Sequence, residues 1–149
     1  MPDLTSHPIL IVEDNDVSYE TTVRAFQQSH LANPIFRCTT SDDALDFLFR
    51  RGAYAPPAEA PRPSIVLLDL RLAQGTDGRE VLQEVKRDPV LRTIPVIVLT
   101  TLEDQLDIQA CYALGANSYI RKPVTFEGYM DAVKSLEQYW FHIVILPDK

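Results

Sequence analysis

The sequence predicts an α/β fold in which a five-stranded parallel sheet carries helices on both faces. Two observations support this prediction. Short apolar segments alternate five times with segments of helical periodicity along the 149 residues, and such alternation is typical of parallel α/β sheets. Three of the apolar segments are apolar throughout, as expected of strands that helices cover on both faces. We therefore expect a doubly wound arrangement of five strands and five helices in strict alternation.

The expected strands share an enrichment in Val, Ile and Leu. In chain order they cover residues 8–12, 35–39, 65–68, 95–99 and 118–120. The first, third and fourth read PILIV, IVLL and PVIVL. These three segments should form the middle of the sheet, because central parallel strands are buried on both faces.

Each segment that follows a strand carries an apolar stripe at helical spacing, which predicts a helix packed on the sheet. In the first of them Tyr19, Val23 and Phe26 lie four and three residues apart. The later stripes are Ala44, Leu45, Leu48 and Phe49; Val81, Leu82 and Val85; Ile108, Cys111 and Leu114, ended by Gly115; and Phe126, Tyr129, Met130, Val133, Leu136 and Trp140.

A proline-rich segment, residues 52–63 (GAYAPPAEAPRP), separates the second helix from the third strand. Four of its twelve residues are proline, so we expect an extended surface loop. This loop is long for a helix-to-strand connection, and the sequence assigns it no chemistry.

Composition limits the class of protein. The length suits one domain, residues 1–149, with a core at about 8–140 and an apolar tail at 141–149. A formal charge of −7 argues against non-specific nucleic-acid binding. The sequence shows no secretory signal in its polar N-terminus and no apolar segment long enough to span a bilayer. Cys38 and Cys111 lie far apart without metal-ligand spacing, so we expect buried thiols and a cytoplasmic location.

The chemistry should lie at the carboxyl ends of the strands, where open parallel sheets bind their ligands. Glu13 and Asp14 follow the first strand, Asp69 follows the third, Thr100 follows the fourth, and Lys122 comes just after the fifth. Three carboxylates in one pocket repel one another, which favours a divalent cation. Mg²⁺ suits this donor set, because it binds through one or two carboxylates and keeps waters for phosphoryl oxygens. Asp69, at the centre, is the candidate nucleophile for phosphoryl transfer.

Taken singly, each of these residues has a simpler structural interpretation. Glu13-Asp14 could cap a helix N-terminus, and Thr100 could cap the helix that follows it. A Lys-Pro pair alone is almost uninformative. Their joint occurrence at successive strand ends favours a common site.

Four segments together resemble the receiver domain of two-component response regulators: ILIVEDN (9–15), IVLLDLRL (65–72), VIVLTT (96–101) and ANSYIRKP (116–123). The resemblance covers residues 8–140. It implies a flavodoxin-like (βα)5 receiver fold with strand order 2-1-3-4-5, and a signalling phospho-acceptor rather than an enzyme.

The resemblance also implies roles for individual residues around the acceptor. Asp69 corresponds to the phospho-acceptor and Asp14 to a direct metal ligand. Glu13 corresponds to a residue that acts on the metal through water. Arg71 would contribute its backbone carbonyl to the metal.

Three further residues correspond to the switch and to the phosphoryl-binding lysine. Thr100 matches the switch hydroxyl, and Tyr119 the aromatic residue that turns inward when Thr100 moves onto the phosphoryl group. Lys122 matches the lysine that binds a phosphoryl oxygen. Its bond to Pro123 is expected to be cis, as is usual for the family.

The loop after the acceptor departs from the family pattern. It reads LRLAQGTDG, with Ala73 where proline is usual and one extra residue before Asp77 and Gly78. This leaves open a receiver that is never phosphorylated and acts as a protein-binding module. An aspartyl-nucleophile phosphohydrolase is also open, but such enzymes favour a second Asp where this chain has Arg71.

Partners are inferred from the remaining features. His7, His30 and His142 lie away from the acidic residues, so the phosphodonor histidine should belong to a separate sensor kinase. The core leaves no room for an output domain. The tail at 139–146 (YWFHIVIL) is strongly apolar, which indicates either packing on its own domain or an interface. We expect a homodimer through the fourth helix, fifth strand, fifth helix and tail. The proline-rich loop and the tail resemble those of small response regulators of phytochrome-type histidine kinases.

Overall fold

The structure, a computed structural model, describes residues 7–147, so the predictions for residues 1–6 and 148–149 lie outside it. One parallel sheet has the strand order β2-β1-β3-β4-β5, which confirms the expected topology. Its strands are β1 (Ile9–Val12), β2 (Ile35–Cys38), β3 (Ile65–Leu68), β4 (Val96–Thr100) and β5 (Ser118–Arg121). Their ends agree with the sequence prediction to within one residue.

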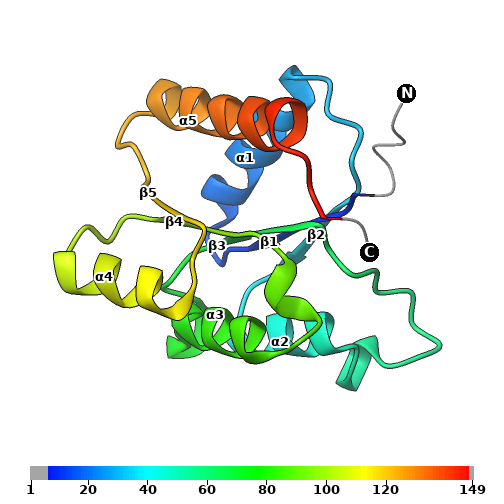
Figure 1. Cartoon of the computed structure of the whole chain (residues 1–149). Helices are drawn as coiled ribbons and strands as arrows, with labels where there is room; N and C mark the ends of the chain where they lie inside the picture. The colour runs from blue at the N-terminus through cyan, green and yellow to red at the C-terminus, as the bar shows by residue number, and fades with distance from the viewer. Residues whose placement is uncertain (1–6, 148–149) are drawn as a thin grey trace.

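Helices cover both faces of the sheet (Figure 1). The helices α1 (Asp16–Gln28) and α5 (Phe126–Gln138) lie on one face, while α2 (Ser41–Phe49), α3 (Gly78–Arg87) and α4 (Gln105–Leu114) lie on the other. Each helix begins after a side chain that accepts a backbone N–H of the first turn, the N-caps being Asn15, Thr40, Asp77, Asp104 and Thr125. Side chains of these types satisfy the free amides of a helix start, so the helix starts are encoded locally.

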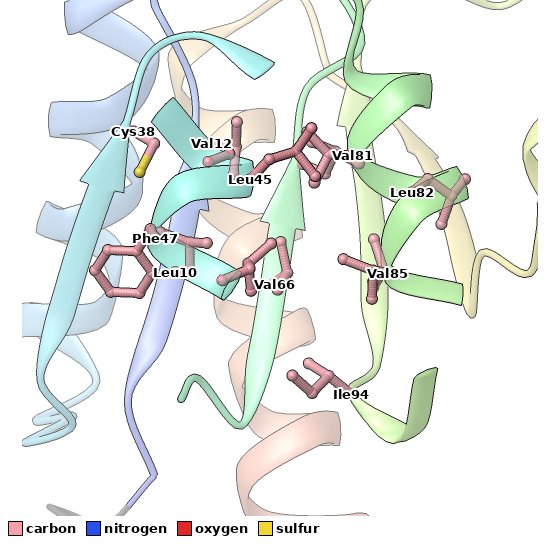
Figure 2. Packing of buried hydrophobic residues seen from close by; sticks show 14 of the residues in the cluster. Leu10, Val12, Cys38, Leu45, Phe47, Val66, Val81, Leu82, Val85 and Ile94 are labelled. Atoms are coloured by element: carbon pink, nitrogen blue, oxygen red, sulfur yellow. The ribbon is translucent and has the colours of Figure 1, made fainter. Parts of the chain in front are cut away.

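Alternate strand residues feed two hydrophobic clusters, one on each face of the sheet. In β1, Leu10 and Val12 belong to the cluster under α2 and α3, whereas Ile9 and Ile11 belong to the cluster under α1 and α5. Figure 2 shows the first cluster, in which Val81, Leu82 and Val85 of α3 pack on the sheet. Cys38 and Cys111 are both buried in it, as predicted. The core therefore holds the carboxyl ends of the strands side by side.

The proline-rich loop is less extended than the sequence predicts. It starts with a 3₁₀ turn, Gly52–Tyr54, and the Tyr54 ring packs edge-on against Phe47 with the centroids 5.1 Å apart. The Tyr54 hydroxyl donates to Asp43 at 2.9 Å. Ala60 near the other end is buried. Aromatic packing thus anchors the start of the loop, while residues 56–59 are exposed, as the sequence predicts.

The apolar tail packs partly on its own domain. The chain continues from α5 into a π-helical turn, Tyr139–Ile143, where Trp140 and Phe141 pack against the cluster under α1 and α5. Ile143 and Ile145 remain 64% and 94% exposed. One side of the tail is therefore covered and the other is free. No helix within residues 7–147 has the length and apolarity that a membrane crossing requires.

Candidate functional site

The sheet register brings the three acidic residues together. β1 and β3 pair with Val12 opposite Leu68, so Glu13 and Asp69 leave neighbouring strands side by side, and the Asp69 amide donates to the Val12 carbonyl at 2.9 Å. Carboxylate oxygens of Glu13, Asp14 and Asp69 lie within 4.8 Å of one another. Glu13 and Asp69 are buried, whereas Asp14 is exposed. The cluster expected from the sequence is thus assembled at one point of the sheet edge.

Lys122 reaches this cluster from the end of β5. Its amide donates to the Thr100 carbonyl at 2.7 Å, and its ammonium group donates to Asp69 Oδ2 at 2.8 Å and to Glu13 Oε1. The predicted cis bond to Pro123 is wrong, because the structure has a trans bond there and a cis bond only at Pro56–Pro57 among the described residues. An X–Pro bond favours trans by about 0.5–1 kcal/mol, and Lys122 contacts both carboxylates with the trans geometry.

The charges of the cluster do not balance, since three carboxylates face one ammonium group. Burial raises the pKa of Glu13 to about 7; the bond from Lys122 opposes this shift and the charge of Asp69 adds to it. Burial lowers the pKa of Lys122, but its bonds to Asp69 and Glu13 outweigh burial and leave the pKa above its ordinary value. A site with excess negative charge in a desolvated pocket favours a cation.

The Asp69 carboxylate is also oriented by the backbone around it. Its Oδ1 accepts the Leu70 amide at 2.7 Å, which leaves Oδ2 for Lys122. Gly78, the first residue of α3, lies against the Asp69 backbone so closely that a β-carbon there would come 2.1 Å from the Asp69 carbonyl oxygen. Only glycine fits this contact, so the start of α3 is packed directly behind the acceptor.

Thr100 and Tyr119 meet at the backbone of Leu102. Thr100 ends β4 and is fully buried, and its hydroxyl accepts the Leu102 amide at 3.4 Å. The Tyr119 hydroxyl donates to the Leu102 carbonyl at 2.8 Å. Burial raises the pKa of Tyr119 to about 12, so the phenol stays a donor at neutral pH. The two residues are thus linked through the first residues after β4.

The loop that follows the acceptor is an ordered turn. Arg71 pairs with Asp77 in an antiparallel bridge, and a 3₁₀ turn, Ala73–Gly75, closes the loop with Gln74 in the left-handed region at φ 60°. The Ala73 amide donates to the Thr39 carbonyl at 3.0 Å. The unusual sequence of this loop therefore gives a defined shape beside Asp69, and Arg71 is exposed at its start.

Two arginines near the site were not singled out by the sequence. Arg79 binds Asp77 through Nη2 at 2.6 Å and Asp107 of α4 through Nη1 at 3.0 Å. Arg37 of β2 donates to the Glu13 carbonyl at 3.0 Å. The Arg79–Asp107 and Arg37–Glu13 contacts join elements that are far apart in the chain. No spacing rule links their members, so sequence reasoning had no signal for them.

A cavity of about 540 Å³ opens beside the site, between the starts of α1 and α5. Lys122 lines it together with Val17, Thr21, Pro123 and Phe126. Val17 is 71% exposed, so the rim of the cavity presents apolar surface to solvent.

Comparison with known proteins identifies the family. Residues 9–134 match the response regulator receiver domain family. The chain is 35% identical to response regulator Rcp1 of Synechocystis sp. over 149 residues, which cover 99% of each chain. The Mn²⁺-bound structure of Rcp1 has a TM-score of 0.89 at 34% identity, over 95% of this chain and 99% of that one.

A second structure, of the phosphorylated cyanobacterial phytochrome response regulator RcpA, has a TM-score of 0.88 at 35% identity over 95% of this chain and 99% of that one. The fold, the order of the strands and the match over most of the sequence all agree. The chain therefore belongs to the family of response regulator receiver domains.

Proposed function

We propose that this chain is a stand-alone response regulator that accepts a phosphoryl group from a sensor histidine kinase on Asp69. The observation that carries the proposal is the placement of Asp69. Its carboxylate lies within 4.8 Å of those of Glu13 and Asp14, and it accepts the Lys122 ammonium group at 2.8 Å. The whole described chain forms one receiver domain that presents this carboxylate.

The donor set fits Mg²⁺. Carboxylate oxygens are hard ligands of the kind that this ion prefers. Three carboxylates share the pocket with one ammonium group, and burial raises the pKa of Glu13 to about 7. Glu13, Asp14, Asp69 and the backbone carbonyl of Arg71 would hold the ion. When bound, Mg²⁺ supplies positive charge that offsets the charge of the transferring phosphoryl group. The Mn²⁺-bound form of Rcp1 supports a divalent cation in this family.

The residues of the chain then have separate tasks in the transfer. The ionised Asp69 carboxylate attacks phosphorus and forms an O–P bond, while the N–P bond of the donor phosphohistidine breaks and its electron pair returns to the imidazole. Lys122 exchanges a carboxylate partner for a phosphoryl oxygen. The Leu70 amide holds Asp69 Oδ1 at 2.7 Å, so the nucleophile is oriented before the donor arrives.

The conformational switch uses Thr100 and Tyr119. The Thr100 hydroxyl donates to a phosphoryl oxygen and leaves the Leu102 amide, to which it is bound at 3.4 Å. Tyr119 is held by the carbonyl of the same residue at 2.8 Å, so a movement of Leu102 releases its ring to turn inward. Phosphorylation is thereby transmitted to the surface of α4 and β5.

The kinase partner belongs to the phytochrome class, since the similar protein RcpA is a phytochrome response regulator. The phosphoryl transfer takes place in the cytoplasm. The donor domain contacts the apolar rim at Val17, Val124 and Phe126, which are 71%, 98% and 48% exposed. A homodimer forms through α4, β5, α5 and the tail, where Leu106 and Ile145 are 75% and 94% exposed.

Phosphorylation by a small donor tests the proposal. Incubation with acetyl phosphate and Mg²⁺ should add a mass of about 80 Da, measured on the intact protein. Asp69→Asn should abolish the addition, and Asp42→Asn, at an exposed aspartate of α2, should retain it. Absence of the added mass in the wild-type protein would contradict the proposal and favour a binding module. Steady turnover of a phosphoester would favour a phosphohydrolase.

A further inference from the structure

We infer that Arg37 is a positioning residue for the metal site, because it fixes the acidic turn formed by residues 13–16. The inference rests on the proposed function, since it concerns how the same site binds its cation. Arg37 lies on the edge strand β2, opposite Ile11 of β1 in the register of the sheet. It belongs to neither the acidic cluster nor the switch, and it contacts the cluster through the backbone carbonyl of Glu13.

Three contacts connect the Arg37 guanidinium to the acidic turn and to the start of α1. Its Nε donates to the backbone carbonyl of Glu13 at 3.0 Å. Its Nη2 donates to Asp16 Oδ1 at 2.8 Å. Its Cζ lies over the Tyr19 ring, 4.5 Å from the centroid. The planar fork of arginine reaches two acceptors at once, whereas a lysine ammonium acts as a point charge. Arg37 thus holds both ends of the turn.

The turn needs such a contact because its own charges oppose its conformation. Glu13, Asp14 and Asp16 are carboxylates within four residues, and the first two also face Asp69. The Glu13 side chain has direct partners, the Lys122 ammonium and the Asn15 amide at 3.3 Å. Asp14 is exposed, so the position of its carboxylate depends on the backbone. Arg37 bonds to that backbone one residue before Asp14.

The charge of Arg37 and its positioning role act on metal affinity with opposite signs. A guanidinium near the site repels a divalent cation, so loss of the charge alone would tighten Mg²⁺ binding. Loss of the hydrogen bonds frees the turn and adds an ordering cost to Mg²⁺ binding, which weakens it. Residues that orient metal ligands change affinity by about tenfold or more when they are removed. We expect the positioning effect to exceed the charge effect, so that binding becomes weaker.

Arg37→Gln and Arg37→Lys separate these effects, with Arg24→Gln as the matched control. Arg24 is an exposed arginine of α1 whose guanidinium lies over Phe126, 5.9 Å from the centroid. The dissociation constant for Mn²⁺ is measured from the free-ion EPR signal, and that for Mg²⁺ by competition. Arg37→Gln should raise both constants about tenfold. Arg37→Lys keeps the charge but cannot span both acceptors, so it should raise them too. Arg24→Gln should stay within about twofold of wild type.

A kinetic measurement adds a readout that a merely structural defect would not produce. In Arg37→Gln the Mg²⁺ concentration for half-maximal phosphorylation by acetyl phosphate should rise, while the rate at saturating Mg²⁺ returns to near the wild-type rate. Unchanged or tighter Mn²⁺ binding in Arg37→Gln would overturn the inference, and so would wild-type affinity in Arg37→Lys. A wild-type protein that bound neither Mn²⁺ nor Mg²⁺ would instead overturn the proposed function, and the inference with it.

Discussion

Two ionic clusters lie at the carboxyl edge of the sheet, and they are built on different principles. The acidic pocket comprises Glu13, Asp14, Asp69 and Lys122, and the side chains of its ion-paired members Glu13, Asp69 and Lys122 are 6%, 10% and 7% exposed. The arginine bridge comprises Asp77, Arg79 and Asp107, whose side chains are 37%, 41% and 25% exposed.

The difference between them lies in how completely the charges are satisfied. Arg79 binds Asp77 through Nε at 3.0 Å and Nη2 at 2.6 Å, and Asp107 through Nη1 at 3.0 Å. The bridge thereby connects the start of α3 to the first turn of α4, and solvent reaches its one excess negative charge. The acidic pocket has lost water and still lacks positive charge. An ion cluster that is buried and left unbalanced indicates a ligand, whereas one that is half exposed and paired indicates a structural contact.

The largest expected effect comes from removing the ammonium group of Lys122 from the acidic pocket. Lys122→Met would leave two buried carboxylates unpaired, and breaking a buried ion pair costs about 3–5 kcal/mol. We expect a loss of this size in the free energy of unfolding of the metal-free protein, measured by urea denaturation. Saturating Mg²⁺ should recover part of the loss, because the ion replaces the missing charge. Equal losses with and without Mg²⁺ would contradict the interpretation of this pocket as a cation site.

The two clusters should also respond oppositely to pH. Burial raises the pKa of Glu13 from 4.5 to about 7, so between these values the folded protein binds more protons than the unfolded chain. The stability of the metal-free protein should therefore fall as pH rises through this window, by on the order of 2 kcal/mol. Glu13→Gln should remove this fall when unfolding is followed in denaturant at pH 5 and pH 7.

The pKa of Asp77 is shifted in the opposite direction to that of Glu13. Burial raises the pKa of Asp77, but hydrogen bonds from the Arg79 side chain and backbone outweigh burial and leave the pKa below its ordinary 3.8. The stability it contributes is present above that ordinary value and is lost only as pH falls through the lower folded-state pKa. Asp77→Asn should leave the difference between pH 5 and pH 7 unchanged. If Asp77→Asn removed the difference in stability between pH 5 and pH 7 and Glu13→Gln did not, the assignment of the two clusters would be reversed.

The smallest expected effect comes from removing the guanidinium group of Arg79 from the arginine bridge. Arg79→Gln should lower the free energy of unfolding by less than about 1 kcal/mol, as is usual for ion pairs that solvent reaches. Mg²⁺ affinity should not change, because the bridge does not contact the carboxylates of the pocket. Urea denaturation and Mn²⁺ titration of the same preparation check both statements. A loss as large as that of Lys122→Met would end the distinction between the clusters.

The sequence predicted most of the fold because the relevant signals are local. Apolar runs specify the strands, and the capping residues Asn15, Thr40, Asp77, Asp104 and Thr125 lie directly before their helices. The proline-rich loop and the tail were predicted less well. Tyr54 packs on Phe47, and Trp140 packs on the core, and such contacts depend on where distant elements lie.

The residues of the site likewise divide into those that the sequence predicted and those that it did not. Glu13, Asp69, Thr100 and Lys122 could be grouped from sequence because each ends a strand or follows one, and parallel strands end at a common edge. Arg37 could not be connected with Glu13, from which it is 24 residues away, because its role depends on the approach of the edge strand to the first turn. The bond at Pro123, which was expected to be cis, is trans in the structure.

By itself, then, the sequence determined which residues form strands and helices, and which polar groups leave the sheet at its carboxyl edge. Periodicity and capping act within a few residues, so they can be read along the chain. Only the tertiary structure decided which of these charges are paired, buried or left in excess. Charge balance depends on distances and desolvation between segments that meet only after folding, and this balance distinguishes the acidic pocket from the arginine bridge.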